Sequence, residues 1–421
     1  MTFGKTLRVL LLGAASAGAI GQAAFAADSV AEAPAAGFNW SGIYVGFGGG
    51  VGAALTGMSP TSLASINAFG GDGAFAELSL GYDHLVGDRL LVGALIDARI
   101  GKIQSQGFIF DPDVQIGGKY GFDAGLRLGY LLAPSTLGYV VGGYSWQRME
   151  FRAPVAIGDT DWGVDGYFVG AGMETVLTGN WTLKTEYRYS DYGAADPLPA
   201  LGAPTGEFAL DTSTHTFSIG ANYRFGGSNG TAATFSAPAY NWSGFYIGGS
   251  AGAGAMLTDA SDSGFIPLSG DGVFGELSVG YDHQIGENWV VGLVADARYG
   301  GISSSLAFLS GELEFKADYG FDLLARVGLK MSDATLAYAL AGYGWQNFEL
   351  SASGLGPSME LDDSASGFVV GGGFEVAISE KTAVNLEYRY SKYGDLDFDT
   401  GFVQLEPSSH TVRVGAKYKF N

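Results

Sequence analysis

The sequence predicts an all-β fold made of two tandem, eight-stranded antiparallel transmembrane β-barrels. Three observations carry this prediction: the chain is duplicated, its segments alternate apolar and polar residues, and the connections between segments alternate in length. Strands with aromatic residues on one face and charges on the other invert the rule for soluble proteins. They are typical of a barrel with lipid outside and a polar interior.

The duplication covers nearly the whole chain. Residues 186–193 (Glu-Tyr-Arg-Tyr-Ser-Asp-Tyr-Gly) return as 387–394 with Lys392 in place of Asp191, and Asn-Trp-Ser-Gly at 39–42 returns at 241–244. The repeat is a whole domain, far longer than the repeats of solenoid proteins. We therefore expect one barrel over 39–225, a small and polar linker over 226–240, and a second barrel over 241–421.

The N-terminus has the pattern of a secretory signal peptide. Lys5 and Arg8 precede an apolar run at 9–20, and Ala-Phe-Ala at 24–26 supplies small residues for cleavage. We expect a signal peptide over 1–26 and a disordered lead-in over 27–38.

Eight alternating segments are expected in each half, each near the ~9–11 residues that a tilted strand needs to cross a bilayer. They lie at about 42–52, 75–84, 89–101, 119–131, 137–149, 163–176, 181–192 and 214–225, and at about 244–254, 274–283, 288–300, 318–330, 335–348, 366–378, 382–393 and 409–420. The segment 137–149 is ambiguous, because Tyr144 and Trp146 conflict with Tyr139 and Val141; a bulge is possible there.

The connections differ in length on the two sides of the predicted barrel. Those at 85–88, 132–136 and 177–180 are short, and those at 53–74, 102–118, 150–162 and 193–213 are long. Short turns on one side and long loops on the other are typical of an outer-membrane barrel with periplasmic turns and extracellular loops.

Composition excludes several classes of site and partner. The chain has 69 Gly, 22 Tyr, 27 Phe and no Cys, and its net charge is -21. Without cysteine there is neither a disulfide framework nor a thiolate metal site, and the acidic balance argues against nucleic acid as a partner. We assign no catalytic residue, no cofactor and no metal site.

Charged residues lie on the predicted inner faces in balanced numbers. An eight-stranded barrel is only wide enough for its own side chains, and a buried charge without a partner is very costly. We therefore expect an interior network of ion pairs that closes the lumen; the alternative is an ion path. The network comprises Glu77, Asp97, Arg99, Arg127, Glu174, Lys184, Glu186 and Arg188 in the first half, and Glu276, Asp296, Arg298, Arg326, Glu375, Glu387, Arg389 and Arg413 in the second.

Aromatic residues on the outer faces predict girdles at the two membrane interfaces. We expect Tyr187, Tyr189, Tyr192, Tyr223 and Phe225 to contribute to them.

Two further patterns suggest chemistry weakly. Asp395, Asp397, Asp399 and Glu406 have the ligand spacing of a calcium loop, but strands flank them and the turn glycine is displaced to Gly401. An acidic surface loop is favoured; weak divalent-cation contact with lipopolysaccharide is the alternative.

Ser213 with His215, and Ser408 with His410, share outward faces near the extracellular rim. A lipid hydrolase could use such a pair only with a third group that the sequence does not identify. A hydrogen-bonded strand end is favoured.

Three motifs together resemble a known family. They are Asn-Trp-Ser-Gly-(Ile/Phe)-Tyr-(Val/Ile)-Gly at 39–46 and 241–248, the strands opening at Glu186 and Glu387, and His-Thr-x-x-x-Gly-x-x-Tyr-x-Phe at 215–225 and 410–420. The chain resembles the small outer-membrane β-barrel proteins of Gram-negative bacteria, which include opacity-like surface antigens and porin-like immunogenic proteins. Members usually carry one barrel, and this chain carries two.

The resemblance implies an eight-stranded barrel in the cell outer membrane with a role in envelope integrity, adhesion or antigenicity. We expect no enzymatic activity. The alternative function is a porin for small solutes. Implied partners are outer-membrane lipid and lipopolysaccharide, periplasmic chaperones, the barrel-assembly machinery and surface ligands of the extracellular loops. Many members end in an aromatic residue that the assembly machinery reads, and here the candidate signal is the penultimate Phe420.

Sixteen strands could also close as one large barrel with an aqueous channel. Each half has its own closing strand that ends in Phe, and the linker is longer than the other periplasmic turns. Balanced interior charges also suit a narrow barrel, so two barrels are favoured.

Overall fold

The computed structural model describes residues 37–60, 64–108, 111–152, 160–196, 208–230, 235–259, 268–308, 311–354, 358–398 and 405–420. The expected signal peptide at 1–26 and most of the lead-in lie outside these ranges. No helix among the described residues is long and apolar enough to cross a membrane.

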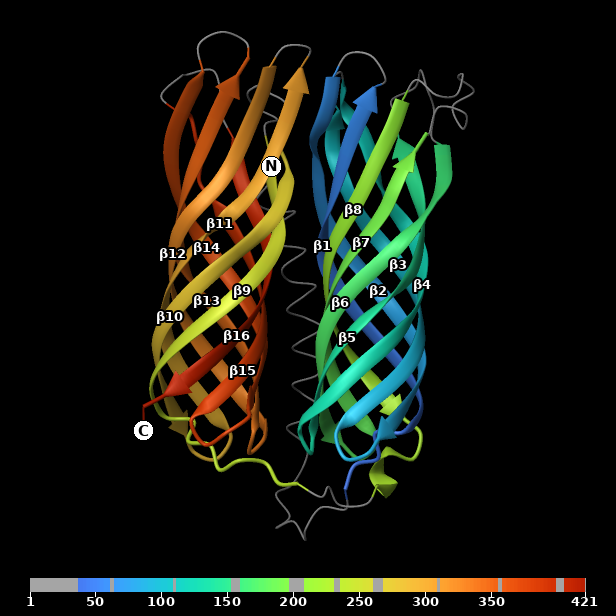
Figure 1. Ribbon diagram of the computed structural model, residues 1–421, viewed down its shortest axis with the longest axis vertical. Coiled ribbons are helices and arrows are strands. Elements are labelled where there is room, and N and C mark those ends of the chain that lie inside the picture. The colour runs from blue at the N-terminus through green and yellow to red at the C-terminus, as the bar shows by residue number, and fades with distance from the viewer. Residues whose placement is uncertain are drawn as a thin grey trace.

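Two upright barrels stand side by side, joined at one end by the linker (Figure 1). The first contains β1 (Gly42–Pro60), β2 (Ala64–Val86), β3 (Leu90–Phe108), β4 (Asp111–Ala133), β5 (Thr136–Arg152), β6 (Thr160–Thr178), β7 (Trp181–Ala195) and β8 (Phe208–Arg224). The second contains β9 (Gly244–Asp259), β10 (Gly270–Ile285), β11 (Trp289–Phe308), β12 (Gly311–Ser332), β13 (Thr335–Ser353), β14 (Met359–Ala377), β15 (Thr382–Tyr393) and β16 (Glu406–Lys419).

Each half closes on itself. Strand β1 pairs antiparallel with both β2 and β8, and β9 pairs antiparallel with both β10 and β16. The prediction of two eight-stranded barrels is confirmed, and the alternative prediction of a single sixteen-stranded barrel is wrong. A short antiparallel contact between β2 and β11, centred on Ser65 and Ala307, links the two barrels.

The strands are longer than the sequence pattern indicated, from 12 residues in β15 to 23 in β2. The excess lies at the extracellular end: β1 continues to Pro60 and β2 begins at Ala64, where a loop over 53–74 was expected. That expectation is wrong because backbone hydrogen bonding between two strands does not require apolar–polar alternation, so the hairpin continues past the part of the sequence that alternates. The barrels therefore extend well beyond the ~9–11 residues per strand that a bilayer requires.

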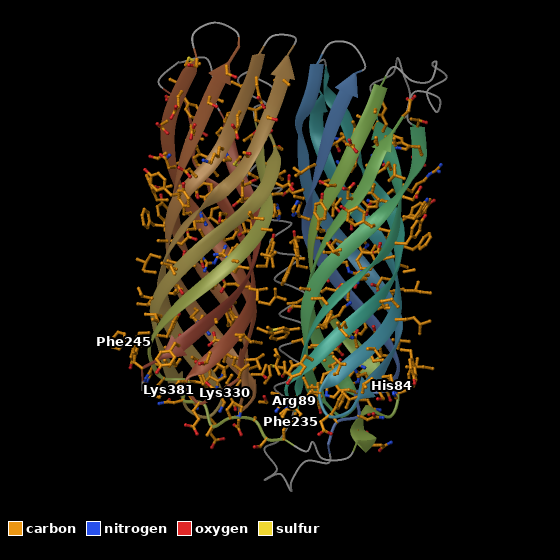
Figure 2. All side chains as sticks on the ribbon, in the orientation of Figure 1. His84, Arg89, Phe235, Phe245, Lys330 and Lys381 are labelled. Atoms are coloured by element: carbon orange, nitrogen blue, oxygen red, sulfur yellow. The ribbon has the colours of Figure 1, made fainter. Side chains whose placement is uncertain are left out.

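The opposite end carries the short turns, and basic side chains lie along it. Figure 2 places Arg89, Lys330 and Lys381 at this end, with Phe235 of the linker next to Arg89. The Arg89 guanidinium carbon lies 3.7 Å from the centre of the Phe235 ring, a cation–π contact that fixes the linker to the first barrel.

Strand β5 alternates without a bulge in its ambiguous stretch. Tyr139 and Val141 point into the barrel and are 5% exposed, whereas Val140 and Tyr144 point outward and are 54% and 43% exposed. Aromatic side chains thus occupy both faces of this strand, and its sequence alone does not identify the inward face.

Candidate functional site: two closed lumens

The lower part of the first lumen, nearest the periplasmic turns, holds a square of four charges. Asp83 and Glu174 are fully buried, and Arg127 and Arg224 each bridge them. Arg127 donates to Asp83 at 3.1 Å and to Glu174 at 2.5 Å. Arg224 donates to the same two carboxylates at 2.8 and 2.9 Å. Every charge in this square therefore has two opposite neighbours.

A second tier of charges lies above the square. Arg188 contacts Asp97, Asp123 and Glu186, with distances of 2.7 Å to Asp123 and 2.5 Å to Glu186. The hydroxyl of the inward Tyr139 donates to Glu186 at 2.8 Å.

Two more bases complete this tier. Arg99 lies 2.8 Å from Asp123, and the Lys184 ammonium lies 2.8 Å from Glu77. The ion pairs thus fill the lumen over a considerable height, which is the arrangement that burial of charge demands.

The second lumen repeats both tiers. Arg326 and Lys417 lie 2.9 and 2.8 Å from Glu375. Above them, Arg389 lies 2.9 Å from both Asp296 and Asp322. The structure therefore gathers the acids and bases of this half into one buried cluster as well.

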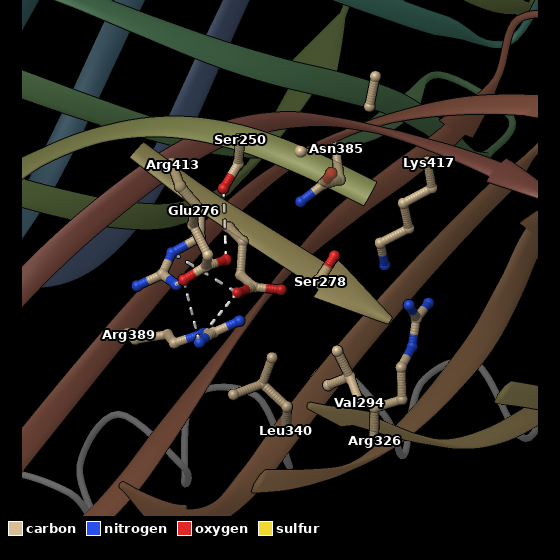
Figure 3. Close-up of a pocket in the computed structure, with 13 residues that line it drawn as sticks. Ser250, Glu276, Ser278, Val294, Arg326, Leu340, Asn385, Arg389, Arg413 and Lys417 are labelled. Carbon is tan, nitrogen blue, oxygen red and sulfur yellow. Dashed lines mark hydrogen bonds and ion pairs between the residues drawn. The ribbon is translucent and has the colours of Figure 1, made fainter. Parts of the chain in front are cut away.

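Further members of this cluster contact the same groups. Arg298 lies 3.2 Å from Asp322, and Glu387 lies 2.6 Å from Arg389. Figure 3 shows Arg389 and Arg413 converging on Glu276. The cavity among these groups has a volume of about 20 Å³, enough for about one water molecule.

One base has changed strand between the two copies. In the first barrel Lys184 of β7 neutralises Glu77, but the matching position of the second barrel is Asn385, which is uncharged. There Arg413 of the neighbouring strand β16 contacts Glu276 instead, and the matching position of the first barrel is Ser218. Pairing of the buried glutamate is retained although the base comes from another strand.

Tryptophan closes the periplasmic mouth of each barrel. Trp40 is 1% exposed; its indole N–H donates to the Pro134 carbonyl at 3.2 Å, and its own carbonyl accepts from Arg224 at 3.0 Å. Trp242 donates to the Asp333 carbonyl at 3.0 Å in the second barrel. Sequence reasoning missed this role; the available signal was a Trp directly before the first strand of each repeat.

An apolar layer fills the extracellular half of each lumen. In the second barrel Phe315 and Phe348 stack with ring centres 5.5 Å apart, and Phe398 and Tyr393 pack around them. The first barrel has a smaller set of buried apolar side chains: Ile116, Met149, Val164, Tyr192 and Leu210. Tyr192 was expected on the outer face and lies inside, so that expectation is wrong.

The outward tyrosines of the repeated strand face the other barrel. Phe217 of the first barrel stacks on Tyr388 of the second with ring centres 4.7 Å apart. Tyr187 donates to or accepts from His215 Nδ1 at 2.8 Å, and Asp271 of the second barrel lies 3.5 Å from His215 Nε2. Tyr187 therefore belongs to an inter-barrel contact and not to a lipid-facing girdle.

The same contact occurs in reciprocal form. Tyr388 lies 2.7 Å from His410 Nδ1, and Asp72 of the first barrel lies 3.8 Å from His410 Nε2. The partner of each histidine at Nδ1 is thus a tyrosine and not Ser213 or Ser408, and the group near Nε2 is an aspartate of the other barrel. The geometry gives no support to a serine–histidine hydrolase.

The remaining candidate residues are Phe420, near the C-terminus, and those of the acidic loop. Phe420 lies on the outer face, 58% exposed, and its N–H donates to the Phe245 carbonyl at 3.2 Å. Asp399 and Gly401 of the acidic loop lie outside the described residues. Within the described ranges, no three or more His, Asp or Glu side chains are grouped so that they could hold a metal ion.

The chain matches known proteins in both halves. A family model described as an outer membrane protein beta-barrel domain matches residues 12–225 and again 230–420. The 31 kDa outer-membrane immunogenic protein of Brucella melitensis is 29% identical over 204 residues, which are 43% of this chain and 85% of that protein. The 22 kDa outer membrane protein of Rhizobium leguminosarum bv. viciae is 31% identical over 185 residues, 44% of this chain and 80% of that protein.

Solved structures also match. Ail of Yersinia pestis has a TM-score of 0.27 at 16% identity, covering 42% of this chain and 99% of that chain. The Pseudomonas putida toluene transporter TodX has a TM-score of 0.26 at 12% identity, covering 90% of each chain. With the family model matched twice, the chain belongs to the outer membrane protein β-barrel family and is a protein of the outer membrane.

Proposed function

We propose that the protein is a closed, non-enzymatic pair of outer-membrane barrels that presents its extracellular ends to the surroundings. Its role would lie in envelope integrity, adhesion or antigenicity. The observation that carries this proposal is the pair of buried ion-pair clusters, each spanning two tiers of its lumen. Relatives named as outer-membrane immunogenic proteins support a surface that is accessible from outside the cell.

Closure has a physical reason in each barrel. An eight-stranded barrel leaves room only for side chains. Here many of them are charges paired with opposite charges, as Arg127 is with Glu174 at 2.5 Å and Lys419 is with Asp282 at 3.3 Å. Moving a solute past them would separate buried ion pairs, which is strongly unfavourable. The Trp40 and Trp242 side chains add a second barrier at the periplasmic mouths. The diffusion porin is the alternative.

Export and assembly follow from the same proposal. We infer that residues 1–26 are removed as a signal peptide, that 39–225 and 241–421 are the two barrel domains, and that 226–240 joins them. Periplasmic chaperones and the barrel-assembly machinery would then act on the unfolded chain, with Phe420, directly after the closing strand β16, as a recognition element.

Conductance tests the closed lumen. The purified full chain, refolded and added to planar lipid bilayers, is expected to give no steady conductance above that of the bare bilayer. A general diffusion porin in the same bilayers provides the positive control. A large, steady, ohmic conductance from the folded chain would favour the porin and contradict the closed lumen.

A further inference from the structure

Four basic side chains gather on the outer face of the first barrel, on strands β3, β4 and β5. They are Lys102, Lys119, Arg148 and Arg152. The last three are 43%, 35% and 42% exposed at the side chain, and Lys102 is exposed. Most other Lys and Arg residues in the described part of the chain lie inside the lumens or, as Figure 2 shows for Arg89, Lys330 and Lys381, at the periplasmic end.

The cluster lies where the lipid-facing band ends on the extracellular side. Arg148 is the register partner of Tyr120, whose ring centre lies 5.9 Å from that of Trp146. Phe122 stacks on Trp146 with ring centres 5.6 Å apart. Such aromatic residues occupy the membrane–water interface. The basic groups directly above them are therefore level with the headgroups of the outer leaflet.

The second barrel supplies an internal comparison. It retains the aromatic layer, with Tyr319 and Phe321 packed on Trp345. At the positions that match the four bases it carries Gly301, Asp318, Asn347 and Ser351, none of them basic. The nearby Lys316 is a single base, and it is paired with Asp318 at 3.5 Å. Since both barrels fold in the same way, folding does not require the basic cluster.

Two acids hold the bases together without neutralising them. Glu150 lies 3.5 Å from Lys119 and 3.1 Å from Arg152, and Asp161 lies 3.6 Å from Lys119 and 3.9 Å from Arg148. Exposed pairs of this kind are weak, about 0–1 kcal/mol, so a stronger anion can compete for the bases. Lys102 forms no ion pair with any described residue.

Phosphate is the anion that this arrangement fits. Arg binds phosphate oxygens through two parallel hydrogen bonds, and Lys adds a mobile point charge. A soluble anion would have no need of the aromatic layer beneath the bases, whereas a phosphorylated lipid would place its acyl chains against that layer. We propose that the outer face of β3–β5 binds the phosphate groups of an outer-leaflet glycolipid, and that the second barrel lacks this site. The proposal rests on the outer-membrane location and is independent of whether the lumen conducts.

Binding of purified rough lipopolysaccharide to the full chain in detergent tests the proposal. The site variant is Lys102→Gln/Lys119→Gln/Arg148→Gln. The matched control is Arg89→Gln/Lys330→Gln/Lys381→Gln, which removes the same charge at the periplasmic end. We expect at least tenfold weaker binding by the site variant and no change in the control. Chemically dephosphorylated lipopolysaccharide is expected to bind the wild type as weakly as the intact lipid binds the site variant.

A gain-of-function variant keeps the test decisive if the site variant fails to fold, as judged by its heat-dependent electrophoretic mobility. Gly301→Lys/Asp318→Lys/Asn347→Arg copies the cluster onto the second barrel. A side chain at position 301 is feasible because an added Cβ meets its nearest atom, on Lys316, at 3.7 Å. Native mass spectrometry is expected to show one additional bound lipid.

Three results would overturn the proposal. The first is a folded site variant that binds lipopolysaccharide as tightly as the wild type. The second is equal binding of the dephosphorylated lipid. The third is saturable binding of inorganic phosphate or a soluble sulfated glycan at the cluster with no binding of the lipid, which would assign the surface to a soluble anion.

Discussion

Removal of one buried carboxylate should destabilise the first barrel strongly. Glu174 is fully buried and accepts from Arg127 at 2.5 Å, Arg224 at 2.9 Å and Thr182 at 2.6 Å. In Glu174→Gln the two guanidinium groups would share only Asp83. Breaking a buried ion pair by removing one partner costs about 3–5 kcal/mol. The unfolding equilibrium constant of the first barrel should therefore rise by a factor of about 10²–10⁴, at one decade per ~1.4 kcal/mol.

Urea unfolding of the full chain in detergent micelles measures this effect, with heat-dependent electrophoretic mobility as the readout of folded barrel. The control is Asp333→Asn, since the Asp333 side chain is 94% exposed and, among the described residues, its ion-pair partner is Lys330 at 3.4 Å. Exposed pairs contribute about 0–1 kcal/mol, so the control should unfold almost as the wild type does. Equal midpoints for Glu174→Gln and Asp333→Asn would refute the ion-pair account of the lumen.

A compensated variant separates loss of pairing from loss of packing. Arg127→Met/Glu174→Met removes one positive and one negative charge and leaves Arg224 paired with Asp83 at 2.8 Å. Apolar replacement of a whole buried pair is often neutral or stabilising, so this variant should be more stable than Glu174→Gln. If it were less stable, shape and not charge balance would dominate the stability of the lumen.

Two further outcomes are expected. Trp40→Ala should destabilise the first barrel by about 3–5 kcal/mol in the same urea assay, because a buried aromatic side chain is lost. Trp181→Ala is the control and should cost clearly less, because Trp181 is 37% exposed. Equal losses of stability would contradict the role of Trp40 as a closing residue. Thr136→Cys/Thr335→Cys should form a disulfide between the barrels, since the two hydroxyl oxygens lie 2.6 Å apart and the chain has no other cysteine. Non-reducing electrophoresis after limited proteolysis of the linker detects the cross-link, and the two single-cysteine variants are the controls. If the two halves of the double variant separated freely, the inter-barrel contact would be disproved.

Alternation and turn length were sufficient to predict closed barrels, because each reflects a local demand of the bilayer. A strand in lipid must turn its apolar side chains outward, and Leu126, at 71% exposure, shows this directly. The extracellular ends of the strands were not predicted, because side chains above the membrane do not have to be apolar on the outer face. There β2 begins at Ala64, in a stretch whose composition resembles a loop.

The partners within each lumen were beyond the reach of sequence. Alternation indicates that Glu77 and Lys184 point inward, but their 2.8 Å contact spans two strands that are not neighbours in the sheet and depends on how the barrel is tilted and closed. The exchange of this lysine for Arg413 in the second copy has the same origin. Charge balance is a property of the whole lumen and not of any one strand.

On the outer face, alternation identifies which side chains point away from the lumen. It does not tell whether lipid or the other barrel covers them. His215 points outward in the same way as Phe217, yet it is only 4% exposed, because the second barrel covers it. Ala53 and Ala255, both fully buried on outward faces, let the two walls approach closely, as small residues do where helices pack in membranes. A histidine facing hydrocarbon would be costly, so the outward histidine of each repeat was the sequence signal for a protein contact. The duplication thus joins two barrels through one shared, reciprocal face, and the tyrosines of the repeated Glu-Tyr-Arg-Tyr strand serve that face.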